Sequence, residues 1–303
     1  MVFARGRQQS AVSTPLLRNQ TRSRSGVVSF FRALFRTMPG RLGSAIILFV
    51  VVLALAAPII APYDPTALNI PNRLDPPSRA HLFGTDETGR DVFSRVVHGS
   101  RISLRVGVIA VAISLSIGVV LGILAGFYGG IVDTVIMRLI DILLAFPGFL
   151  LALAIIAMRG PGLFNAMIAV GLGAAPGFAR LLRGAVLTVK QQDYVMAARL
   201  VGASNGHIMR KQILPNVLSP IVVLATLEFP VAILVAASLS FLGLGAQPPS
   251  PEWGAMVVAG RTFIRTASWL INFPGLAIFV TVLGFNLFGN AVRDALDPRL
   301  RQR

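Results

Sequence analysis

Most residue types that carry out chemistry are either missing from this chain or widely separated along it. The 303-residue sequence has no cysteine, which excludes disulfides, thiol catalysis and cysteine metal sites. Its three histidines lie far apart, without the spacing of metal ligands: His81, His98 and His207. Asp86, Glu87 and Asp91 could offer carboxylate oxygens, but their spacing does not match a calcium-binding loop. We therefore expect no metal site and no catalytic residues in this chain.

One carboxylate is conspicuous because of its surroundings. Glu228 lies about halfway along the apolar stretch 217–242. An ionisable residue inside a membrane span is costly and commonly marks a substrate or ion path. Two interpretations remain open: Glu228 faces a water-filled path and meets polar or cationic substrate groups, or it makes a structural hydrogen bond to another span. Asp133, Arg138 and Asp141, near the end of another apolar stretch, are more typical of structural ion pairs.

The segments that hold these residues are strongly apolar. Of the sequence, 54% is hydrophobic and 13% is charged, whereas soluble domains average about 25% charged residues. Apolar blocks of about 20 residues are long enough to cross a bilayer. We predict an all-α, polytopic membrane protein with six transmembrane helices and exclude a soluble enzyme. The predicted spans are Leu42–Ala61, Leu104–Phe127, Ile140–Met158, Leu163–Leu182, Val217–Leu242 and Phe273–Val292.

The distribution of basic residues predicts how the spans are oriented. Lys and Arg outnumber Asp and Glu by 28 to 12, and the first 42 residues contain eight Arg and no acid. Such a cluster at the edge of a span indicates a cytoplasmic flank facing anionic lipid, not a nucleic-acid site. Segments 179–212 and 293–303 are also net positive, whereas loop 62–103 is balanced. We therefore predict that both termini and segment 179–212 are cytoplasmic.

A stripe of small residues marks the second predicted span. Its members recur every four residues: Ala110, Ser114, Gly118, Gly122, Gly126 and Gly130. This spacing places them on one helix face, where small side chains let another backbone approach closely. We expect the stripe to pack against another helix of the same chain, with a subunit interface as the alternative.

Two further helices are predicted near the outer side. Residues 92–101 alternate apolar and basic side chains at helical spacing, which predicts a separate amphipathic helix on the membrane surface. Ser250, Pro251 and Glu252 have the order of a helix start, with a hydroxyl cap, Pro at the first position and an acid in the first turn. They predict a short helix over about 252–263.

The cytoplasmic segment 193–216 has the pattern of two short helices around a glycine corner. Asp193 can cap the first helix, and Gly202 is the expected left-handed stop. Ser204 can cap the second helix, which should end around 214–216 because the residue before Pro215 resists helix. Ala197 and Ala198 would offer a smooth surface for close docking. No residue type in this segment indicates chemistry, so we predict a docking element.

Several segments together carry a resemblance to a known family. Residues 193–204 resemble the "EAA" loop of binding-protein-dependent ABC importers, whose permease subunits use it to dock on an ATPase. The similarity extends from about Leu42 to Arg301 and narrows the family to the C-type permeases of dipeptide, oligopeptide, glutathione and nickel importers. The other matching segments are FGTDETGRD at 83–91, MRLID at 137–141, AFP at 145–147, ILPN at 213–216, LSFLGLG at 239–245 and RDALDP at 293–298.

The resemblance implies the type I ABC importer permease fold and a location in a bacterial or archaeal cytoplasmic membrane. It implies three kinds of protein partner: a homologous second permease subunit, two ABC ATPase subunits and an external solute-binding protein; membrane lipid is the partner predicted from the basic flank. ATP and Mg would be bound by the ATPases, since this chain has no Gly-x-x-x-x-Gly-Lys-Ser/Thr loop. The implied ATPase-coupling residues are Met196, Ala197, Ala198, Arg199, Gly202, Ala203, Ser204, Leu214 and Pro215.

Two positions depart from the family pattern. Met196 stands where the family usually has the Glu of this loop, so the reciprocal bond of an Asp193-x-x-Glu capping box is missing. Asn290 stands where an acid is common near the inner end of the last span. We expect the docking element to form, with a less firmly fixed helix start.

The predicted organisation has four parts: a basic arm 1–41, a first span with an external loop 42–102, a permease core 103–292 with coupling loop 193–216, and a tail 293–303. The expected cargo is a peptide, either a di- or oligopeptide or one like glutathione; nickel or another chelated solute is the alternative. A secondary transporter is the alternative from another class, but it would need matched broken helices and coupling-ion sites at mid-membrane. Only Glu228 is ionisable at that depth.

Overall fold

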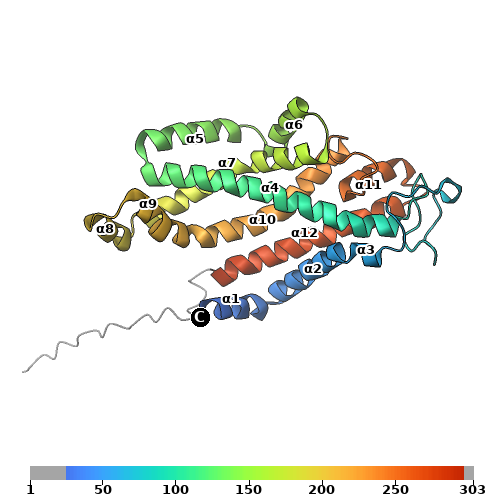
Figure 1. Cartoon of the computed structure of the whole chain (residues 1–303), viewed down its shortest axis with the longest axis horizontal. Helices are drawn as coiled ribbons and strands as arrows, with labels where there is room; N and C mark the ends of the chain where they lie inside the picture. The colour runs from blue at the N-terminus through green and yellow to red at the C-terminus, as the bar shows by residue number, and fades with distance from the viewer. Residues whose placement is uncertain (1–24, 297–303) are drawn as a thin grey trace, which may run out of the picture.

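The computed structural model describes residues 25–296, and this part of the chain is built from helices and loops (Figure 1). Its one strand-like pairing is an isolated antiparallel bridge between Thr85 and Asp91. Five of the eight arginines in the basic arm, and the end of the tail from 297 onward, lie outside the described residues.

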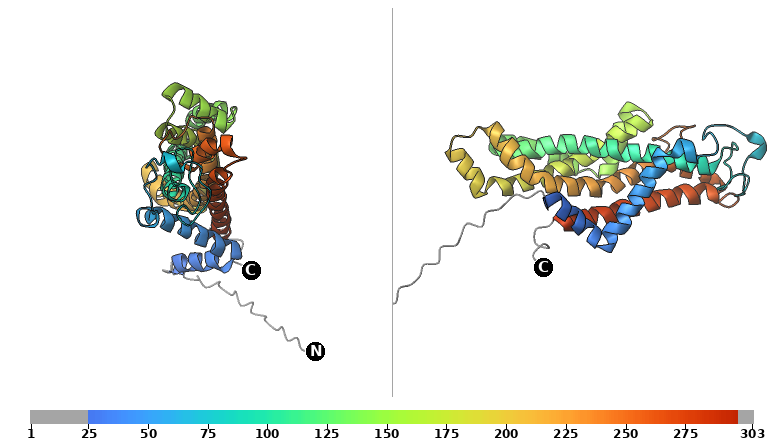
Figure 2. Two further views of the ribbon diagram at one scale, coloured as in Figure 1. Left: turned by 90° about the vertical axis from the view of Figure 1, so that its right-hand side faces the viewer. Right: turned by 60° about the horizontal axis from the view of Figure 1, so that its bottom comes forward.

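The helices form an elongated bundle with loops at one end and a short helical pair at the other (Figures 1 and 2). In chain order they are α1 (Ser25–Arg36), α2 (Met38–Leu55), α3 (Ala57–Ile60), α4 (Val92–Tyr128), α5 (Gly130–Leu144), α6 (Gly148–Arg159), α7 (Leu163–Lys190), α8 (Asp193–Leu200), α9 (Asn205–Ile208), α10 (Leu214–Phe241), α11 (Trp253–Gly260) and α12 (Trp269–Leu296). Short 3-10 turns cover Ile70–Asn72 and Arg261–Phe263, and a π-helical turn covers Met209–Ile213.

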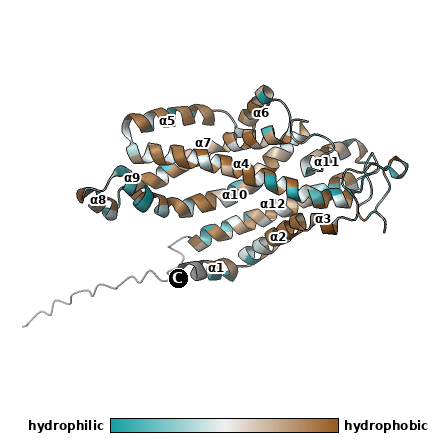
Figure 3. Ribbon diagram, viewed as in Figure 1, coloured by the Kyte–Doolittle hydropathy of each residue, from teal (hydrophilic) through white to brown (hydrophobic). Residues whose placement is uncertain are grey.

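Within residues 25–296, five helices are long and apolar enough to cross a membrane, and a bent helix pair brings the number to six if it counts as one span. The five are Met38–Leu55, Val92–Tyr128, Leu163–Lys190, Asn205–Phe241 and Trp269–Leu296. Figure 3 shows apolar residues along these helices and many hydrophilic residues around α9. The sixth predicted span, Ile140–Met158, is not a continuous helix. The chain breaks between α5 and α6, which meet at 89°. Pro147 lies at the break, where it can supply no backbone N–H and disfavours helix in the residue before it.

The centre of the bundle is the contact between α4 and α7, which pack along much of their length. The hydroxyl of Ser114 donates to the carbonyls of Ala110 and Gly171, at 2.9 Å each. Gly118 faces the Cβ of Phe178, and a Cβ at Gly126 would come within 2.8 Å of the Cβ of Val186. The stripe therefore lies against another helix of this chain.

Gly130 does not belong to this contact. Gly129 ends α4 with a φ of 69°, and Gly130 then begins α5 with a φ of 53°. A Cβ at Gly130 would meet nothing within 4 Å. The four-residue period continues through the sequence, but the helix that would give it a common face has already ended.

The predicted surface helix over 92–101 is wrong as a separate element. These residues are the first turns of α4, which continues for 37 residues. Val92, Val96 and Val97 are buried, and Val92 and Val96 pack in a cluster with Trp253 of α11 and Leu270 of α12. The apolar face expected to lie on lipid instead packs on protein. Asp91 caps the helix by accepting from the backbone N–H of Ser94 at 2.7 Å.

The short helix predicted over 252–263 is present as α11, but its cap differs from the expectation. The carboxylate of Glu252 accepts from the amides of Gly254 and Ala255, at 2.8 Å each. Glu252 is thus the N-cap and Ser250 lies outside the helix. A carboxylate that reaches two free amides satisfies more of the helix start than the predicted serine hydroxyl would.

An additional helix, α1, was not among the predicted elements. Its Leu34 is buried against Ala291 and Val292 of α12, whereas Phe31 and Phe35 are exposed and stack with a centroid separation of 6.3 Å. Figure 2 shows α2 crossing α12 beyond this point. The first transmembrane helix is therefore fixed at its start as well as along its length.

Candidate functional site

The element predicted to dock lies at the end of the bundle opposite loop 62–91 (Figure 1). We call residues 193–213 the knob; it comprises α8, the corner at Gly202, α9 and the π-helical turn. Gly202 has a φ of 80°, a left-handed conformation that glycine adopts without the strain of a Cβ. The Ser204 hydroxyl accepts from the amide of His207 at 3.3 Å and caps α9. The corner and the second cap thus follow the predicted pattern.

Two predicted boundaries of the knob are wrong. Gln192, not Asp193, is the N-cap of α8 and makes no side-chain capping bond; Asp193 is the first helical residue. The second helix does not end near Pro215, since Asn205–Phe241 runs on as a single span through the π-helical turn. A wider turn before Pro215 accommodates a residue that cannot donate a backbone N–H.

A small core fixes the knob to the bundle. Val195, Ile208 and Ile213 are fully buried and pack with Phe127 at the end of α4 and Val186 of α7. Ala198 and Ala203 are partly buried against the same cluster.

Two cations lie against Phe127 at this junction, Lys190 from α7 and Arg199 from the knob. The ammonium of Lys190 donates to the carbonyl of Phe127 at 2.6 Å, and the Arg199 guanidinium lies 5.7 Å from the centroid of the Phe127 ring. The Lys190 bond joins α7 to α4, and the cation–π contact of Arg199 joins α8 of the knob to the same Phe127.

The exposed surface of the knob is more apolar than the ATPase-coupling residues implied by the family resemblance would make it. Leu200 and Val201 are 88% and 83% exposed, just before Gly202. Met196 is 50% exposed, and Ala197 and Ser204 are also exposed. Leu214 and Pro215 are exposed as well, at the start of α10. Sequence reasoning missed Leu200 and Val201, although an apolar pair beside a glycine corner in a polar segment was a usable signal.

Glu228 lies half-buried near the middle of α10. Its neighbours in sequence are packed: Phe229 stacks on Phe285 of α12 with ring centroids 3.9 Å apart and lies against Gly107 of α4. The Glu228 carboxylate makes no hydrogen bond or ion pair with any residue in the described range 25–296. This geometry favours the path interpretation over a structural hydrogen bond, and the role of Glu228 stays a prediction.

Ion pairs connect α5 to α7. Asp133 accepts two bonds of 2.5 Å from the guanidinium of Arg183, and Asp141 pairs with Arg180. These pairs hold the first arm of the bent segment beside α7. Asp133 and Asp141 therefore have structural partners as expected, but Arg138, predicted with them, makes no ion pair with another residue of the range 25–296.

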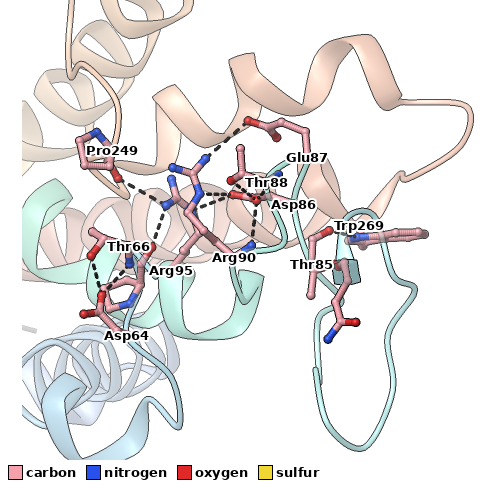
Figure 4. Close-up of polar contacts among 12 residues, drawn as sticks. Asp64, Thr66, Thr85, Asp86, Glu87, Thr88, Arg90, Arg95, Pro249 and Trp269 are labelled. Carbon is pink, nitrogen blue, oxygen red and sulfur yellow. Dashed lines mark hydrogen bonds and ion pairs between the residues drawn. The ribbon is translucent and has the colours of Figure 1, made fainter. Parts of the chain in front are cut away.

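At the opposite end, buried polar residues join loop 62–91 to the helices (Figure 4). Asp86 accepts from Nε of Arg90 at 2.6 Å, and Arg95 donates to the carbonyl of Pro249 at 3.4 Å. Burial alone would raise the pKa of Asp86, but bonds from Thr88 and from the amide of Arg90, together with the Arg90 charge, lower it. The ionised carboxylate of Asp86 also lies 3.6 Å from Nε of Arg95 in α4, which ties the loop to that helix.

The same end is tied to two tryptophans. Trp269 donates from Nε1 to the carbonyl of Thr85 at 3.1 Å, and Trp253 donates to the carbonyl of Val96 at 2.9 Å. His81 lies 2.9 Å from Asp91, measured from Nδ1 to Oδ1. Loop 62–91, the start of α4, α11 and the start of α12 are therefore connected by hydrogen bonds between buried or partly buried groups.

Family models match most of the chain. Residues 118–302 match the model described as "Binding-protein-dependent transport system inner membrane component", and residues 28–77 match "N-terminal TM domain of oligopeptide transport permease C".

Similar proteins extend this match. The dipeptide transport system permease protein DppC of Alkalihalophilus pseudofirmus is 47% identical over 271 residues, with 89% of each chain covered. The glutathione transport system permease protein GsiD of Escherichia coli O157:H7 is 46% identical over 296 residues, covering 97% of this chain and 98% of that protein. An inward-facing structure of the MetNI methionine ABC transporter has a TM-score of 0.56 at 22% identity, covering 67% of this chain and 97% of the other.

Proposed function

Because the chain belongs to the family of inner-membrane components of binding-protein-dependent transport systems, we propose that it forms half of the translocation path of an ATP-driven importer for peptides. It is a multi-pass, non-catalytic permease subunit. Membership of this family removes the secondary transporter as an alternative.

The observation that carries the proposed mechanism is the knob. Its core fixes it to α4 and α7, while Leu200 and Val201 at its tip are exposed. An apolar tip on a rigid support fits a groove on another protein, since interface anchors are large, well-packed side chains. The partner we infer is an ABC ATPase on the cytoplasmic side, one of two in the complex. With the knob cytoplasmic, Asp86 and its network lie on the outer side, where a solute-binding protein would dock.

Closure of the ATPases on ATP would then displace the knob together with α4 and α7. A homologous second permease would complete the path, and the pair would alternate between inward-open and outward-open states. The peptide cargo is inferred from the relatives, whose names include dipeptide and glutathione transport systems. The half-buried carboxylate of Glu228, which has no hydrogen-bond or ion-pair partner among residues 25–296, is compatible with a cargo that carries an ammonium group.

The proposed function is tested by reconstituting the complete complex in vesicles. We expect uptake of a radiolabelled dipeptide that requires ATP and the solute-binding protein and that ceases when either is omitted. An ion gradient alone should not support it. Peptide uptake without ATP, or ATP-dependent uptake of a chelated metal but of no peptide, would contradict the proposal.

Replacing Gly202 with valine should uncouple ATP hydrolysis from uptake. The left-handed conformation at Gly202 costs a residue with a Cβ about 1–2 kcal/mol, so the corner should distort, although a Cβ there meets nothing within 4 Å. We expect about tenfold less peptide imported per ATP hydrolysed, with the complex still assembled. Gly206→Val is the matched control because Gly206 lies in the same knob, is equally open and has no positive φ. Normal coupling in Gly202→Val would exclude the corner from a role.

A further inference from the structure

The aromatic surface of α1 is only half covered within residues 25–296. Phe31 and Phe35 are 49% and 46% exposed, and their rings stack with an interplanar angle of 14°. The neighbouring Leu34 is 2% exposed and packs on Ala291 and Val292 of α12. Helix α1 therefore uses only part of its apolar surface to attach itself to the bundle.

Arginines occupy the side of α1 beyond this aromatic surface. Successive residues of an α-helix are turned by about 100°, so Leu34, Phe35 and Arg36 point in three successive directions. Arg32 lies about one turn before Arg36 and shares its side. Both arginines are exposed, and neither forms an ion pair with another residue of the range 25–296. Around the helix, a protein contact is thus followed by aromatic rings and then by positive charge.

The corner between α1 and α2 is fixed by hydrogen bonds. The hydroxyl of Thr37 donates to the carbonyl of Leu34 at 3.3 Å and accepts from the amide of Gly40 at 3.2 Å. A Cβ at Gly40 would collide with the same carbonyl of Leu34. The direction of α1 is therefore set relative to the membrane-crossing helix that follows it.

Helix α1 lies at the level where the apolar spans end. The exposed Arg41 precedes the long apolar run of α2, and the exposed Arg293 directly follows the buried Val292 of α12. Because α1 packs on that end of α12, it lies where apolar side chains give way to charged ones. This level corresponds to the boundary between acyl chains and headgroups. Figures 1 and 2 show α1 at the edge of the bundle, next to α2 and α12.

The order of these surfaces favours a lipid leaflet over a protein groove as the occupant. A protein would have to offer an apolar pocket and, beside it, acids for two arginines, all at the level of the headgroups. An anionic leaflet presents acyl chains directly below phosphates, which suits a helix with aromatic and basic sides. Five further arginines precede α1 in the sequence, and the first 42 residues contain no acid. The charge around α1 is thus of the sign that anionic lipid attracts.

We propose that α1 is a binding site for an anionic phospholipid of the leaflet on the knob side. Phe31 and Phe35 insert between the acyl chains, and Arg32 and Arg36 bind the phosphate. Because α1 is held on both α2 and α12, the bound lipid fixes the position of these two helices relative to the membrane surface. This role goes beyond peptide import and does not depend on the cargo.

The test identifies what covers the aromatic surface in the complete complex. A photoreactive analogue, p-benzoylphenylalanine, replaces Phe35, and the complex is placed in vesicles of equal parts phosphatidylglycerol and phosphatidylcholine. After illumination, the crosslinked products are identified by mass spectrometry. We expect a phospholipid product, with phosphatidylglycerol preferred about fivefold or more, as one or two arginines near an anionic headgroup imply. If this variant does not assemble, the analogue at Phe31 makes the same measurement.

Matched variants assign the preference to the arginines of α1. Arg32→Gln with Arg36→Gln should make the two lipids crosslink about equally. Arg73→Gln with Arg79→Gln removes two exposed arginines from loop 62–91 instead and should keep the preference. The analogue at Leu48, which is 63% exposed near the middle of α2, should crosslink both lipids about equally.

Three results would overturn the inference. A crosslink from Phe35 to the second permease or to an ATPase would make this face a protein interface, and the absence of any crosslink would place it in water. Equal crosslinking of the two lipids in the complex with unchanged arginines would remove the preference for anionic lipid. None of these outcomes depends on peptide uptake, so the proposed function would stand or fall separately.

Discussion

Replacing Leu200 and Val201 together with aspartate is expected to abolish ATP-driven uptake, by at least a hundredfold. Both side chains are at the tip of the knob and are 88% and 83% exposed. Because they are not part of the knob's own core, the change should leave that core intact. In the complex they would be buried against the ATPase, where two unpaired carboxylates are costly to desolvate. The permease should therefore reach the membrane in normal amount and lose its ATPases during purification.

The matched control adds the same two charges elsewhere on the knob. Asn205→Asp with Gly206→Asp places them in the first turn of α9, where both positions are exposed and acids interact favourably with the helix dipole. We expect this variant to retain its ATPases and at least half of its uptake. If instead the Leu200 and Val201 variant retained its ATPases, the tip would not be the docking surface.

Replacing Gly122 with isoleucine should prevent stable folding of the chain. A Cβ at Gly122 would lie 2.7 Å from the carbonyl oxygen of Ala179 and 2.8 Å from the Cβ of Leu182. Neither atom can move away without shifting α7, because both belong to or lie next to its backbone. Extra atoms in a well-packed contact typically cost 1–3 kcal/mol, and here the separation of two whole helices adds to that cost.

Yield and thermal stability in detergent measure this effect. Gly184→Ile is the control, since Gly184 lies on α7 and a Cβ there would meet nothing within 4 Å. We expect the Gly122 variant to be degraded or to melt at least 10 °C lower, as a change of a few kcal/mol implies, and the Gly184 variant to melt like the wild type. Similar melting of both variants would contradict the close contact between α4 and α7.

Local features of the fold could be read from the sequence because they act over a few residues. The glycine corner at 202 follows from a missing Cβ, and the cap at Ser204 from a hydroxyl one turn before a free amide. The four-residue spacing of the stripe from Ala110 to Gly126 predicts a close contact with another helix. Long apolar blocks likewise set the number of candidate spans, because the bilayer thickness fixes how many residues are needed.

Tertiary packing decided everything that depends on which face meets which neighbour. Periodicity showed that residues 92–101 have an apolar face, but only the fold put that face on Trp253 instead of lipid. It likewise decided that α5 and α6 bend at 89° near Pro147 and that a π-helical turn carries the chain past Pro215. A cavity of about 400 Å³ likewise joins residues of α6, α10, α11 and α12. Sequence spacing determines which residues share a face of a single helix. Contacts between distant segments depend on how all the helices pack together to bury those faces.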